Sequence, residues 1–223
     1  IYNGLHLEGK MGDILEKLGR TRKVIAVSAS ADKSLLRKSE DFPGSYDPHI
    51  WFNVALWQKA TQGLLPELTA LDPENAAYYQ ERAKKQAEEL NSLHSWTLEQ
   101  IASIPENQRV LITAHDAFGY FGDAYKIEVR GLQGISTVSE FGLLDVSNLV
   151  KFITEKRIKA VFVESSVPKK SIEAVVTGCR DRGHKVKIGG ELYSDALGAE
   201  GTPEGTYAGM VRHNVNTITR ALR

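Results

Sequence analysis

The chain has 223 residues, of which 42% are hydrophobic and 25% are charged. These values are typical of a folded globular protein, and the length suits one large domain or two small ones. The 28 basic and 28 acidic residues cancel, so the net charge does not favour nucleic acid as the main partner. No stretch of the sequence approaches the roughly 20 apolar residues that a bilayer-spanning helix needs.

Cys179 is the only cysteine in the sequence. A single thiol excludes a disulfide within the chain and a zinc site built from several cysteines. Cys179 falls near the end of a predicted helix, where a packing role is favoured over a nucleophilic one.

The first third of the chain is predicted to contain two helices and one strand. Residues 10–19 place apolar side chains at helical spacing. The run at 23–29, "KVIAVSA", is short, apolar and rich in β-branched residues, which predicts a buried strand. Residues 30–46 are polar with glycine and proline and are typical of a loop. A second helix is predicted from about residue 50 to residue 68.

A long helix follows, and it divides the chain. Asp72 is predicted to cap it, Pro73 to occupy its first position and Pro105 to end it. At about 30 residues it would be roughly 45 Å long, which indicates a connection between two lobes. We therefore predict an N-terminal lobe (1–71), a linking helix (72–105) and a C-terminal α/β lobe (106–223).

The last part of the chain alternates strands and helices. Strands are predicted at 109–114, 126–131, 159–165 and 185–190. Helices are predicted at about 116–123, 143–157, 169–182 and 205–222. Continuous apolar strands that alternate with helices indicate an α/β fold whose parallel sheet is covered on both faces.

Three polar residues fall where such a sheet binds ligands, at the carboxyl ends of its strands. His115 follows the strand at 109–114, Asp195 follows the strand at 185–190, and His49 follows the loop at 30–46. Two imidazoles and a carboxylate suit Zn, Mn or Fe(II). Each residue taken singly has a structural alternative as a helix cap or a loop contact, and only the combination makes a metal set competitive.

Four further residues are weaker candidates. Glu8, Glu140 and Glu164 lie at or near the ends of predicted elements. Glu164 directly follows an apolar strand, where a carboxylate could hold the N–H of a metal-binding histidine. Helix capping or a solvated loop position is the alternative for all three. His6 lies near the start of the chain and is also a candidate.

The remaining histidines, His94, His184 and His213, are interpreted as structural or exposed. The sequence contains no dinucleotide-binding glycine motif, no phosphate-binding P-loop, no nucleophile elbow and no H-E-x-x-H zinc motif.

Several segments together resemble the TroA-type metal-binding proteins, which are the zinc- and manganese-binding receptors of bacterial ABC transporters. The segments include "IYNGLHLEGKMGDIL", "DPHIWFNVALW", "LITAHDAFGYF", "IGGELYSDALG" and "GTYAGMVRHNV". The resemblance extends over residues 1–223, with the motifs in order. It implies two α/β lobes with parallel sheets, joined by a long rigid helix, and one metal ion held between the lobes.

The resemblance also implies the ligands of that ion. Three of the four family ligands correspond to His49, His115 and Asp195. The fourth is a histidine that precedes the "YNGLHLE" stretch in the family, so we expect the first lobe to be incomplete at its N-terminus. The imidazoles favour zinc on intrinsic affinity, but the resemblance does not choose between zinc and manganese.

The expected function is that of a receptor and not of an enzyme. Such a receptor captures zinc, manganese or iron in the periplasm or at the cell surface and delivers it to an ABC permease. Its attachment to the membrane would be a lipid anchor alone. Release is expected to involve movement of Asp195 with the loop at 190–198. The alternative is a metal-dependent hydrolase that uses the same three residues, a metal-bound water, and Glu8 or Glu140 as base.

Overall fold

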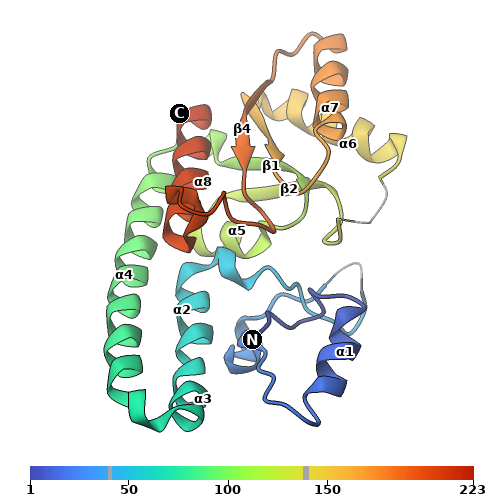
Figure 1. Cartoon of the computed structure of the whole chain (residues 1–223). Coiled ribbons are helices and arrows are strands. Elements are labelled where there is room, and N and C mark those ends of the chain that lie inside the picture. Colours follow the sequence, from blue (N-terminus) through green and yellow to red (C-terminus); the bar gives the residue numbers. More distant parts are fainter. Residues whose placement is uncertain (40–41, 138–140) are drawn as a thin grey trace. The chain divides into compact units, whose positions relative to one another are not determined.

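The computed structural model describes residues 1–39, 42–137 and 141–223. The chain forms two compact units, Ile1–His94 and Ser95–Arg223. The boundary between them falls within the long helix α4, Ala76–Ala102. The α/β class, the parallel strands and the long helix are confirmed (Figure 1).

The helices of the first unit begin with α1, Met11–Leu18, as predicted. The helix predicted from 50 to 68 is instead broken into three pieces, which are η3 (Ile50–Phe52), α2 (Val54–Gln62) and α3 (Leu64–Leu71). The break at Gly63 has a physical cause in Pro66. Proline has no N–H to donate to the carbonyl of Gln62, and its ring would clash with that carbonyl in a continuous helix. A short turn, η4 (Pro73–Asn75), leads into the 27 residues of α4.

The strand predicted at 23–29 is wrong. Tyr2 and Ala26 form an isolated parallel bridge, in which Tyr2 N–H donates to Ile25 O at 3.0 Å. The chain then enters a short turn, η1 (Val27–Ser30). The parallel pairing does not extend into a strand, because the segment that contains Tyr2 turns away at Gly4, where φ is 85°. The first unit also contains the turn η2 (Lys33–Leu35).

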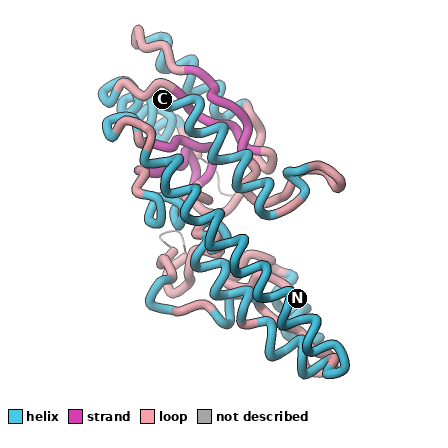
Figure 2. The backbone as a smooth tube through the Cα atoms, turned by 90° about the vertical axis from the view of Figure 1, so that its left-hand side faces the viewer, coloured by secondary structure: helices cyan, strands magenta, loops and turns pink. Residues whose placement is uncertain are grey.

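The second unit contains the four predicted strands, with their ends displaced by one or two residues. They are β1 (Val110–His115), β2 (Glu128–Gln133), β3 (Ala160–Glu164) and β4 (Lys187–Leu192). β1 pairs with β2 and β3 pairs with β4, both in parallel, while β1 also packs beside β3. Figure 2 shows these strands gathered in the part of the chain that contains the C-terminus.

Helices cover both sides of these strands (Figure 1). They are α5 (Gly119–Tyr125), α6 (Leu143–Lys156), α7 (Lys170–Asp181) and α8 (Tyr207–Leu222), with short turns at Glu106–Gln108 and Pro203–Gly205. Alternate residues of β1 and β3 pack with α6 and α7 in one apolar core that also buries Cys179. α8 packs on β4 instead. The strands are therefore held rigidly, and their carboxyl ends are fixed in place.

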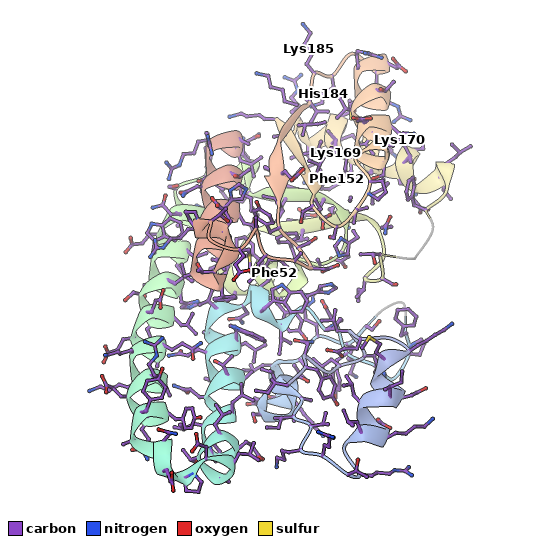
Figure 3. The ribbon with its side chains drawn as sticks, viewed as in Figure 1. Phe52, Phe152, Lys169, Lys170, His184 and Lys185 are labelled. Carbon is purple, nitrogen blue, oxygen red and sulfur yellow. The ribbon has the colours of Figure 1, made fainter. Side chains whose placement is uncertain are left out.

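The loop between α7 and β4 carries His184 and Lys185, and α7 begins beside Lys169 (Figure 3). Within the described parts of the chain, no helix has both the length and the apolar character to cross a bilayer.

Candidate metal centre

The carboxyl ends of β1 and β3 bring His115 and Glu164 together. Both side chains are fully buried. One oxygen of Glu164 accepts hydrogen bonds from the N–H groups of Ala114 (2.8 Å) and His115 (2.9 Å). The other oxygen lies 2.6 Å from Nδ1 of His115. Glu164 therefore fixes both the main chain and the ring of His115.

Asp195 approaches the opposite side of the same imidazole. It follows β4, and its Oδ2 lies 3.4 Å from Nε2 of His115. Its side chain is 23% exposed, whereas His115 is fully enclosed. The imidazole thus has a carboxylate near each of its two nitrogens. His115, Asp195 and Glu164, all predicted from strand ends, meet at one edge of the strands.

This arrangement favours positive charge at the edge. Burial by itself favours the neutral imidazole, but the contacts with Asp195 and Glu164 outweigh it and raise the pKa of His115 to about 9. A divalent cation that binds Nε2 would replace the proton and would be attracted by the same carboxylates. The second unit therefore supplies an imidazole and a carboxylate of the kinds that bind Zn and Mn.

His49, in the first unit, has a similar partner. Its main-chain N–H donates to Oδ1 of Asp47 at 2.9 Å, and its Nδ1 lies 2.7 Å from the same oxygen. Its ring meets Trp51 edge-on, with the ring centroids 5.1 Å apart. An imidazole that gives its Nδ1 hydrogen to a carboxylate binds a metal through Nε2. His49 and His115 each have a carboxylate beside Nδ1 and would therefore bind a metal through Nε2.

Asp47 is a partner of the candidate ligand His49 that sequence reasoning missed. It is buried, and Arg37 approaches its second oxygen at 3.8 Å. The signal was present in "DPH", where the aspartate stands two residues before the histidine. An aspartate beside a proline in a loop is more often a turn former, so the pattern alone did not single it out.

The other weaker candidates are Glu8, His6 and Glu140. Glu8 accepts hydrogen bonds from the N–H groups of Asn3 (2.8 Å) and Gly4 (3.3 Å), and these residues lie outside any helix. His6 is exposed in a left-handed turn with a φ of 65°. Glu140 lies outside the described residues.

The other three histidines contact the protein itself. His184 Nε2 lies 2.8 Å from Ile158 O, and His213 Nε2 lies 2.9 Å from Glu191 O. His94 is half-buried in α4, and burial lowers its pKa. The contacts of His184 and His213 agree with the structural interpretation.

Comparison with known proteins identifies close relatives of this chain. The family described as "Zinc-uptake complex component A periplasmic" matches residues 1–221. The manganese-binding lipoprotein MntA of Bacillus subtilis (strain 168) is 51% identical over 223 residues, covering 100% of this chain and 72% of the relative. The zinc-binding protein TroA of Treponema pallidum is 45% identical over 222 residues, covering 100% and 71%.

Solved structures agree with these matches. The structure of the periplasmic zinc-binding protein TroA from Treponema pallidum superposes with a TM-score of 0.95 at 45% identity. The match covers 99% of this chain and 79% of that one. A second structure, from work on the metal-binding specificity of TroA, has a TM-score of 0.92 at 34% identity.

Proposed function

We propose a ligand set and a partner for this chain, which belongs to the family of periplasmic zinc-uptake component A, the solute-binding receptors of metal ABC transporters. It is a receptor that binds zinc or manganese as transported cargo, and it is not an enzyme. Its place of action is the periplasm or the cell surface. The relatives named above give the hydrolase alternative no support.

The proposed ligands are His49, His115 and Asp195. The observation that carries the proposal is the buried imidazole of His115, which has Glu164 2.6 Å from Nδ1 and Asp195 3.4 Å from Nε2. Carboxylates of this kind orient a metal-binding histidine and raise its basicity. His49, with Asp47 at its Nδ1, is prepared in the same way.

Glu164 and Asp47 are then the residues that hold the two imidazoles in place. Glu8 binds the main chain of Asn3 and Gly4, and His6 is exposed, so the proposed set does not include them. Two imidazoles and a carboxylate favour zinc over manganese on intrinsic affinity, and supply in the cell can reverse that order. Binding of iron remains a prediction.

Delivery to a membrane permease completes the proposal. Several relatives are described as metal-binding lipoproteins, some of them explicitly as ABC transporter substrate-binding lipoproteins. A lipid anchor would keep such a receptor beside its permease. We also retain the division into a first lobe (1–71), a linking helix (72–105) and a second lobe (106–223) as a proposal.

The test is metal binding by the purified protein, followed by titration with Zn²⁺ and Mn²⁺ against a chromophoric chelator. His115→Ala is expected to weaken Zn²⁺ binding at least 100-fold because it removes a ligand outright. His184→Ala is the matched control, since the imidazole of His184 contacts the main chain, with Nε2 2.8 Å from Ile158 O. Equal affinities in the wild type and in His115→Ala would refute the ligand set.

A further inference from the structure

The geometry points to Asn214 as the residue that positions Asp195, by clamping the main chain that leads into it. This inference rests on the proposed role of Asp195 as a metal ligand. Asn214 lies in α8, within the segment "GTYAGMVRHNV", and no metal ligand has been proposed in that helix. It is nonetheless buried, with 2% of its surface exposed.

Asn214 binds both main-chain polar groups of Tyr193. Its Oδ1 accepts from Tyr193 N–H at 2.9 Å, and its Nδ2 donates to Tyr193 O at 2.7 Å. These two bonds fix the peptide planes on both sides of Tyr193. The second plane leads into Ser194, which directly precedes Asp195. The donor and acceptor pattern of Tyr193 also requires the side-chain amide to point in this one direction.

Two neighbouring contacts hold the same segment. His213 Nε2 lies 2.9 Å from Glu191 O, and the His213 ring meets Tyr193 with the centroids 5.0 Å apart. The side chain of Glu191 forms an ion pair with Lys169 at 2.8 Å, beside the start of α7 (Figure 3). The main chain from 191 to 193 is therefore held from α8 and from the α7 side.

Ser194 has a partner on a second loop. Its Oγ lies 2.5 Å from Oγ of Ser166, which follows β3. Glu164, the carboxylate that holds His115, ends that same strand two residues earlier. The two hydroxyls thus join the segment carrying Asp195 to the segment that orients His115.

Close packing prevents α8 from moving independently of β4. A Cβ atom at Gly190 would lie 2.4 Å from Cγ2 of Thr217, and one at Gly189 would lie 2.7 Å from Cβ of Ala221. Only glycine allows the helix and the strand to approach so closely. Asn214 in α8 and Tyr193 just after β4 are therefore carried by two elements that are packed tightly together.

The loop at 190–198 is expected, from the sequence, to move during metal release. These contacts limit that movement to the part of the loop that begins at Asp195. Side chains of α8 hold the main chain up to Tyr193, and Ser166 holds the side chain of Ser194, so displacement of Asp195 begins at Asp195 itself. Asn214 then acts by placing the carboxylate beside His115 before metal arrives. A ligand placed in advance loses less conformational freedom on binding, and supporting residues of this kind typically contribute 10–100-fold in metal affinity.

A double-mutant cycle tests the inference. Zn²⁺ affinity is measured for the wild type, Asn214→Ala, Asp195→Ala and the double variant, with Asn216→Ala on the exposed side of α8 as matched control. We expect Asn214→Ala to weaken binding about 10–100-fold in the wild-type background. In the Asp195→Ala background we expect its further effect to be less than about threefold, because the residue acts through Asp195.

A metal-independent readout accompanies the cycle. Hydrogen exchange of the Tyr193 amide, measured without metal, is expected to accelerate in Asn214→Ala and to stay unchanged in Asn216→Ala. The visible spectrum of bound Co²⁺ is expected to change in Asn214→Ala toward that of Asp195→Ala, since both alter the carboxylate contribution.

Ser166→Ala keeps the test decisive if Asn214→Ala fails to fold. Ser166 is exposed, so the fold should tolerate its loss. The inference is supported if Ser166→Ala weakens Zn²⁺ binding by less than the 10–100-fold expected for Asn214→Ala, and if this effect disappears in the Asp195→Ala background. The inference is overturned if a variant weakens Zn²⁺ binding equally in the wild-type and Asp195→Ala backgrounds. It is also overturned if neither Asn214→Ala nor Ser166→Ala weakens Zn²⁺ binding. If Asp195→Ala alone leaves Zn²⁺ affinity unchanged, the proposed ligand set fails as well.

Discussion

Replacing Glu164 by glutamine should lower the pKa of His115, because it removes a carboxylate and keeps the shape. The raised pKa of about 9, against an ordinary value of 6.5, corresponds to about 3 kcal/mol in favour of the imidazolium. Since burial opposes this shift, Glu164 and Asp195 together contribute more than that. Glu164 supplies part of this stabilisation through its hydrogen bond and its charge.

Glu164→Gln is therefore expected to lower the pKa of His115 below its wild-type value of about 9 in metal-free protein. Titration of the His115 Cε1–H resonance by NMR measures this directly. The amide can still accept from Ala114 and His115 N–H, so the fold should survive the substitution. Glu173→Gln, at an exposed position of α7, is the control with the same chemical change. An unchanged His115 pKa in Glu164→Gln would refute the argument that this carboxylate sets the charge of the site.

Three other outcomes are expected. The stability that His115 adds to the metal-free protein should be complete below about pH 6.5 and decline as pH rises toward 9, because its folded pKa is raised; urea unfolding across that range should show the loss, and a rising stability would contradict it. Asp47→Asn should weaken Zn²⁺ binding about tenfold by removing the carboxylate at Nδ1 of His49, as chelator competition would show. Gly190→Ala should destabilise the protein by about 1–3 kcal/mol, since Cβ would meet Thr217; an unaltered melting temperature would contradict the close packing of α8 on β4.

The strands and helices of the second unit were predictable because their apolar periods are strong. The pattern placed the fourth strand at 185–190, whereas β4 is Lys187–Leu192. Hydrophobicity marks where a strand is buried, and hydrogen bonding to β3 decides where it ends. The strand predicted at 23–29 failed because apolar character cannot reveal that its partner turns away at Gly4. The helix predicted at 50–68 is broken at Gly63, and the apolar period alone did not reveal the effect of Pro66 on that break.

The site was predictable where it follows from topology. Parallel strands end at one edge, so His115, Glu164 and Asp195 could be expected to meet there. Asn214 could not be found in this way. A single asparagine in a helix gives no sign of binding a main chain 21 residues earlier in sequence. The contact exists because α8 returns onto β4, which is a property of the packing.

The measurement that tests the central claim most directly is X-ray absorption at the zinc edge of the loaded protein. The proposed ligands predict at least two imidazole nitrogens at about 2.0–2.1 Å and a carboxylate oxygen at about 2.0–2.2 Å. In His115→Ala one imidazole should disappear from the zinc coordination while the other remains. The same number of imidazoles in the wild type and in His115→Ala would contradict the proposed site.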